Sequence, residues 1–169
     1  MKLKQFSTTA SATVLAGGLL GSLAFAAPAL AAVETIFIND GNVPTTAEDF
    51  ENQSCDNIPP GDIDNDEDGW VFVLPASAGA EGNFISVTAL FEDEDGDPQL
   101  LDTDNDGGIV SGSGDNKAYI VSPAGWTLID ASAEVEDPDD DAFFNLTHAC
   151  PGEPGNGGPG KGPDQGDFE

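Results

Sequence analysis

The chain has 169 residues and is strongly acidic, since 32 Asp and Glu residues outnumber four Lys and no Arg and give a formal net charge of −28. A surface with this charge repels polyanions, which excludes DNA, RNA and anionic membranes as binding partners. It attracts cations and basic surfaces, and it destabilises a compact state unless salt screens the charge or ions bind it.

The N-terminal segment has the three parts of a secretory signal peptide. Lys2 and Lys4 are basic, Val14–Ala26 is an uncharged apolar run, and Ala29–Ala31 is a small-x-small cleavage site. An uncleaved membrane anchor is the alternative, because the apolar stretch approaches spanning length. A glycine pair, a proline and the cleavage site itself favour removal of the segment.

We therefore predict that residues 1–31 are a signal peptide and that the mature protein is secreted or associated with the cell surface, without a transmembrane segment. The mature chain keeps Lys117 and Lys161 against all 32 acidic residues, so its formal charge becomes −30. Residues 32–150 are long enough for one domain with its own core. Residues 151–169 are rich in Pro and Gly and are predicted to form a flexible tail.

The domain contains apolar runs with the period-two patterning and the β-branched and aromatic content of strands. These runs are Val33–Ile38, Trp70–Leu74, Phe84–Phe91, Lys117–Val121, Trp126–Ile129, Ala131–Val135 and Ala142–Cys150. No window has a long helical stripe, although Thr45–Gln53 has room for one short helix. Ser122–Gly125 has the residues of a type I turn, so we expect it to link two paired strands. Short strands separated by turns predict an all-β fold, a single Ig-like β-sandwich.

The two cysteines, Cys55 and Cys150, form an even pair, which outside the cytoplasm predicts a disulfide. A metal-binding or redox pair is the alternative, but no CxxC spacing and no group of additional Cys or His residues accompanies them. The disulfide would close the sandwich by joining the start of the domain to its last strand. In the chain-entropy model a closed loop of about 96 residues is worth roughly 4–5 kcal/mol.

Two Asp- and Gly-rich loops, predicted at 61–69 and 102–116, each contain Asp-x-Asp-x-Asp-Gly, the first half of a calcium loop. The carboxylates in this pattern are Asp64, Asp66, Asp68, Asp102, Asp104 and Asp106. The bidentate Glu expected at the twelfth position is replaced by Pro75 and Ser113, so neither loop is an EF-hand. Ca²⁺ is the one cofactor that the sequence suggests. In so acidic a chain, a plain solvated loop is the favoured interpretation.

The sequence contains no distinguished catalytic arrangement, and we expect no enzymatic activity. His148 is the only histidine in the chain, and no Gly-x-Ser-x-Gly motif accompanies it. Carboxylates are abundant, but no pair is set apart by the apolar surroundings that raise the pKa of a catalytic acid. Trp70, Trp126 and Tyr119 fit a hydrophobic core better than a platform for stacking sugars.

Four segments of the chain carry a family resemblance in combination: Trp70–Pro75, Phe84–Phe91, Ser122–Leu128 and Phe144–Cys150, of which the last, Phe-Asn-Leu-Thr-His-Ala-Cys, is the most specific. Together they resemble the repeating β domain of secreted and cell-wall-anchored surface proteins of actinobacteria. The resemblance implies an extracellular β domain that precedes a Pro/Gly-rich stalk and a sortase signal. Here the stalk begins at Pro151, and the sorting signal is absent.

From these features we expect a non-catalytic domain with a structural or interaction role, whose partners are cell-wall or surface components. A calcium-dependent adhesion module, or one that binds carbohydrate, is the alternative. The two interpretations differ in whether the aspartate loops hold a metal ion.

Overall fold

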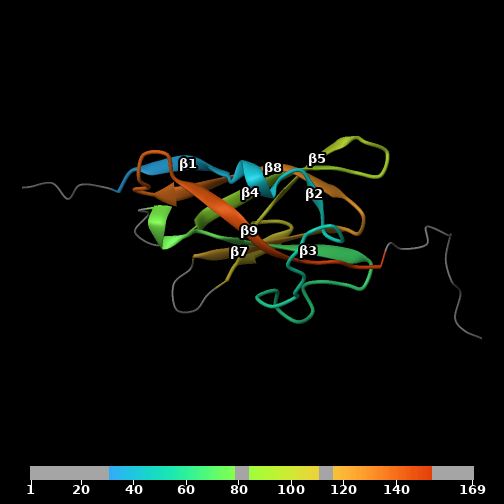
Figure 1. The fold of residues 1–169 in the computed structure, drawn as a ribbon. Coiled ribbons are helices and arrows are strands. Elements are labelled where there is room, and N and C mark those ends of the chain that lie inside the picture. The colour runs from blue at the N-terminus through green and yellow to red at the C-terminus, as the bar shows by residue number, and fades with distance from the viewer. Residues whose placement is uncertain (1–30, 79–83, 111–115, 154–169) are drawn as a thin grey trace, which may run out of the picture. The chain divides into compact units, whose positions relative to one another are not determined.

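The computed structural model describes residues 31–78, 84–110 and 116–153 (Figure 1). Within these ranges the strands are β1 (Val33–Ile38), β2 (Thr45–Thr46), β3 (Glu67–Val73), β4 (Phe84–Glu92), β5 (Pro98–Asp102), β6 (Gly107–Ile109), β7 (Lys117–Pro123), β8 (Thr127–Glu136) and β9 (Phe143–Cys150). Two short 3-10 helices, η1 (Asp40–Asn42) and η2 (Ala76–Ala78), complete the regular elements of this part. The prediction of an all-β fold is confirmed.

The predicted signal peptide up to residue 30 and the tail from residue 154 lie outside the described residues, so both stay predictions. Among the described residues, no helix has the length and apolar character needed to cross a membrane.

The strands form one hydrogen-bonded path in the order β5-β4-β8-β1-β9-β3-β7-β6, and β2 pairs with β8. Strand β9 joins the two halves of this path. Its first residues, Phe143 and Phe144, pair in parallel with β1, whereas its residues from Asn145 onward pair antiparallel with β3. Figure 1 shows β1, β4 and β8 in one layer and β3 and β7 in the other, with β9 crossing between them. The sheet is therefore nearly closed on itself.

The core fills the space between the two layers because alternate residues of the strands point inward. In β4 the buried positions are Phe84, Val87, Ala89 and Phe91. The ring centroids of Trp70 and Phe91 lie 5.3 Å apart, an aromatic contact between β3 and β4. Trp70 is fully buried, and its Nε1 donates a hydrogen bond to Ser122 Oγ at 3.0 Å. Trp70 is thus a core residue, as expected.

The one short helix for which Thr45–Gln53 has room does not form. Thr45 and Thr46 form β2 against β8, and Gln53 forms an isolated parallel bridge with Ala149. The backbone of this segment finds hydrogen-bond partners on other strands, and β-branched threonines favour that extended conformation.

The turn at Ser122–Gly125 forms, but it does not link two paired strands as expected. Strand β7 pairs with β3 and β6, whereas β8 pairs with β1, β2 and β4. The turn carries the chain from one layer to the other. It is held there because the Ala124 and Gly125 N–H groups donate to the Asp66 carbonyl and to the Asp68 carboxylate.

Two predicted strands, Trp126–Ile129 and Ala131–Val135, are one continuous strand, β8. Its register against β4 shifts between the pairs Leu90–Asp130 and Phe91–Leu128, so a β-bulge interrupts the alternation. Strands β2, β5 and β6 were not predicted from the pattern. Strand β6 lies inside the predicted loop 102–116, which is therefore shorter than expected.

Candidate functional site

The disulfide between Cys55 and Cys150 is present, which confirms the prediction. It joins the segment before β3 to the last residue of β9. The bridge lies beside a small apolar cluster, separate from the main core, that contains Ile58, Val71 and Tyr119. The bond therefore closes the domain where its first long loop meets its final strand.

The three carboxylates of the first aspartate loop differ in burial. Asp64 and Asp66 are exposed, but Asp68 lies in β3 and is only 3% exposed. The Asp68 oxygens accept N–H groups from Gly125, at 2.9 Å, and from Gly152, at 2.8 Å. Burial raises the pKa of Asp68, and these two hydrogen bonds partly oppose the increase. Asp68 thus ties together the turn after β7 and the segment after β9.

The second aspartate loop is closed by its own carboxylates. Asp102 accepts the backbone N–H groups of Asp104 and Asn105, both at 2.9 Å, and Asp106 accepts that of Asp102 at 3.1 Å. The hydrogen bond from the Asn105 side chain is the main reason that the pKa of Asp102 is lowered. These bonds follow the Asx-turn pattern, in which an aspartate side chain folds the chain around itself. Asp104 remains exposed.

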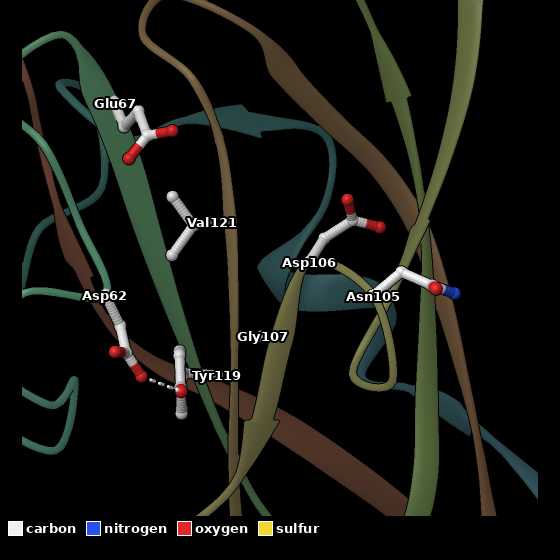
Figure 2. Close-up of a pocket in the computed structure, with 7 residues that line it drawn as sticks. All are labelled: Asp62, Glu67, Asn105, Asp106, Gly107, Tyr119 and Val121. Carbon is white, nitrogen blue, oxygen red and sulfur yellow. Dashed lines mark hydrogen bonds between the residues drawn. The ribbon is translucent and has the colours of Figure 1, made fainter.

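Both loops border one open pocket of about 330 Å³ (Figure 2). Its lining residues are Asp62, Glu67, Asn105, Asp106, Gly107, Tyr119 and Val121. Figure 2 shows Glu67 on one side, Asp106 on the other and Val121 between them. Of the six predicted ligands, only Asp106 lines this pocket.

A metal centre among these residues stays a prediction. Within the three described ranges, no group of three or more His, Cys, Asp or Glu side chains has the spacing to hold a metal ion. The two loops do converge at one pocket, but their Asp-x-Asp-x-Asp carboxylates do not converge there.

Tyr119 and Asp62 are hydrogen-bonded within the pocket. The Tyr119 Oη donates to Asp62 Oδ2 at 2.5 Å (Figure 2). Burial, together with the Asp62 carboxylate, raises the pKa of Tyr119 to about 12, so the hydroxyl keeps its proton at neutral pH. Asp62 lies in the predicted loop 61–69, but it is not part of the Asp-x-Asp-x-Asp-Gly pattern, so the sequence did not indicate it.

His148 has a structural position. Its Nε2 lies 2.6 Å from the carbonyl oxygen of Asp56, and its Nδ1 lies 3.3 Å from Thr147 Oγ1. The carbonyl can only accept, so Nε2 carries a proton and donates it to this oxygen. His148 therefore connects β9 to the segment next to Cys55.

Comparison of the chain with protein-family models, with curated proteins and with solved structures finds no match. The fold and the site define the class of protein. It is an acidic all-β domain whose sheet is nearly closed and in which a disulfide joins the segment before β3 to the end of β9.

Proposed function

We propose that this chain is an exported, non-catalytic β domain with a structural or interaction role at the cell exterior. The observation that carries the proposal is that the two cysteines, His148 and Asp68 hold the fold together. Cys55 and Cys150 are oxidised, and both ring nitrogens of His148 have hydrogen-bond partners. Asp68 is buried with both of its oxygens accepting backbone N–H groups.

The proposed location draws support from the disulfide and from the N-terminal sequence. Disulfides persist in oxidising compartments outside the cytoplasm, and a small domain gains stability from one. The three-part pattern of residues 1–31 is typical of exported proteins. The resemblance to actinobacterial surface domains adds cell-wall or surface components as proposed partners.

Expression of the full chain in a secreting bacterial host tests the location. We expect the protein in the medium, with an N-terminus at Ala32 or Val33 and with no free thiol. Retention in the cytoplasm, or two free thiols in the exported protein, would contradict the proposal.

Co-sedimentation with washed bacterial cell envelopes tests the interaction role. We expect the secreted protein to sediment with the envelopes and to do so less after reduction of the disulfide. A reduced and alkylated sample is the matched control, because its charge and composition hardly differ. Sedimentation no greater than that of an unrelated protein of similar charge would remove the role.

A calcium-dependent adhesion module, binding carbohydrate or another surface ligand, is the second candidate. The pocket between the two loops favours it, because Glu67 and Asp106 bring carboxylate oxygens to one open space. Calorimetric titration with Ca²⁺ should then give heat of binding, and thermal unfolding with Ca²⁺ should give a higher Tm. Glu67→Gln and Asp106→Asn should each reduce the heat and the increase in Tm. Asp95→Asn, in the hairpin between β4 and β5, is the control. No heat and an unchanged Tm at millimolar Ca²⁺ would remove this candidate.

A further inference from the structure

We infer that the exposed face around Phe37 and Phe143 docks a basic protein segment that presents an apolar side chain next to Lys or Arg. The inference rests on the proposed interaction role and names a surface and a class of partner for it.

Two phenylalanines form an aromatic pair on the outside of the sheet. Phe37 in β1 is 59% exposed and Phe143 in β9 is 46% exposed. They are register partners in the parallel β1–β9 ladder, so their side chains are neighbours on one face. The residues that follow them, Ile38 and Phe144, are buried in the core. The outward position of the pair therefore follows from the alternation of the two strands.

The rest of this face gives the pair little apolar cover. Phe37 pairs with Ser132 in β8, and Ser132 pairs in turn with Thr88 in β4. Both of these neighbours are small and polar. Two further exposed apolar side chains lie on these strands: Val33, which pairs with Glu136 at the start of β1, and Ile85, near the start of β4. Large exposed aromatic side chains surrounded by polar residues are typical of a binding surface.

Carboxylates lie on two sides of the aromatic pair. Glu134 and Glu136 are exposed on β8, next to β1. Three exposed residues, Asp139, Asp140 and Asp141, come just before Phe143, and all four line a pocket of about 120 Å³. A Lys or Arg side chain at this position can rest its stem on the phenylalanine ring and place its charge among the carboxylates.

The charge of the molecule selects the partner. Lys117, at the start of β7 in the other layer, is the only Lys or Arg in the described ranges. Its Nζ donates a hydrogen bond to Asn57 Oδ1 at 3.0 Å. Within residues 31–78, 84–110 and 116–153, no Lys or Arg is therefore left to pair with the carboxylates around the aromatic pair. A second copy of this chain would bring the same negative charge and would be repelled. A basic segment with an apolar side chain is complementary to both features.

A synthetic peptide of alternating Lys and Phe is the probe, titrated into the full chain and followed by fluorescence anisotropy. One control peptide replaces each Phe with Ser, and a second replaces each Lys with Glu. We expect binding of the Lys-Phe peptide at least about tenfold tighter than binding of either control, because both the charge and the ring contribute.

Variants of the chain locate the binding surface. The double variant Phe37→Ser with Phe143→Ser removes the rings, and Leu100→Ser on edge strand β5 is its control, because Leu100 is 70% exposed. A triple variant removes the charges beside the rings: Asp139→Asn, Asp140→Asn and Asp141→Asn. Its control removes three charges from the hairpin between β4 and β5: Glu94→Gln, Asp95→Asn and Asp97→Asn. We expect each surface variant to weaken binding about tenfold and each control to change it less than twofold.

The substitutions are chosen to preserve the fold. Asp141 has a positive φ of 65°, a conformation that Asn tolerates. Unchanged near-ultraviolet circular dichroism identifies variants that remain folded, and the charge variants test the surface independently of the ring variants.

Three outcomes would overturn the inference. Equal loss of binding in the control variants would show attraction by net charge alone. Equal binding of the Lys-Ser peptide would show that the rings contribute nothing. A dimer in analytical ultracentrifugation that Phe37→Ser breaks would show that the face binds a second copy. None of these outcomes affects co-sedimentation with cell envelopes, so the proposed function is tested separately.

Discussion

Asp68 shows how one residue can look like a metal ligand in the sequence and act as a structural tie in the fold. Its position in the Asp-x-Asp-x-Asp-Gly pattern predicted a calcium ligand. In the structure it is the second residue of β3, buried, and hydrogen-bonded to Gly125 and Gly152. These contacts connect segments far apart in the chain. Spacing within a loop carries no information about them.

Replacement of Asp68 by Asn should destabilise the domain by about 1–3 kcal/mol, because one buried N–H then faces an amide donor instead of an acceptor. Burial raises the pKa of Asp68 in the folded state above its ordinary value of 3.8. The folded chain therefore holds that proton more tightly than the unfolded chain does. The added stability is complete below the unfolded pKa and is lost as the pH rises through the folded pKa.

Urea unfolding at pH 3 and at pH 7 measures both effects. The difference in free energy of unfolding between the natural chain and Asp68→Asn should be larger at pH 3. Asp93→Asn is a useful contrast, because the backbone N–H of Asp97 is the main cause of a lowered pKa at Asp93. Its effect should be larger at pH 7. A larger Asp68→Asn effect at pH 7 would contradict the assignment.

At the scale of elements, strands with clear alternation were predictable, and strands defined by their neighbours were not. Strand β1 has the predicted bounds, because its β-branched and aromatic residues favour an extended strand without information from its neighbours. Strand β5 begins with a proline, and β6 contains two glycines, residues that are rare in strands. Both lie at the ends of the strand path, where they pair on one side only.

Gly107 in β6 lies very close to β7. A Cβ at this position would overlap the backbone carbonyl oxygen of Tyr119, whereas one at Gly108 would meet only the Tyr119 side chain, at 3.1 Å from its Oη. We expect Gly107→Ala to displace β6 from β7 and to lower the Tm by several degrees, since overpacking costs about 1–3 kcal/mol.

Gly108→Ala is the matched control, with an effect less than half as large, because a side chain can move where a backbone cannot. Amide hydrogen exchange of Val121, whose N–H donates to the Asp106 carbonyl, reports on the same region. Equal Tm values for the two variants would show that the close approach has no energetic consequence.

For the whole molecule, the disulfide and the charge act in opposite directions on stability. The disulfide closes a loop with a sequence separation of 95 residues. The charge of −28 on the whole chain, or −30 without the signal peptide, favours expansion by self-repulsion. The small domain therefore depends on its bridge and on the ions around it.

Removal of the disulfide by Cys55→Ser with Cys150→Ser should lower the free energy of unfolding by roughly 2–5 kcal/mol, because the unfolded chain gains freedom. Chemical denaturation with and without reductant measures the change. Reductant should destabilise the natural chain and leave the variant unaffected. A natural chain whose stability is insensitive to complete reduction would refute this role for the bridge.

Added NaCl should raise the Tm, since screening reduces repulsion among the carboxylates. Adaptation to a saline habitat predicts a further rise above about 1 M, where the Debye length is already near 3 Å and screening is nearly complete. The triple variant Glu94→Gln, Asp95→Asn and Asp97→Asn should show a smaller rise below 0.5 M. A Tm that does not change with salt would show that repulsion is unimportant.

The sequence by itself determined the all-β class, most of the strands, the disulfide and the acidic character. These properties depend on local alternation, on a single possible cysteine pairing and on composition. Only the tertiary structure decided that β9 joins the two layers, that Asp68 is a buried tie and that the two aspartate loops border one pocket. It also placed Phe37 beside Phe143. Each of these features is a contact between segments distant in the chain, which strand register sets and local pattern does not encode.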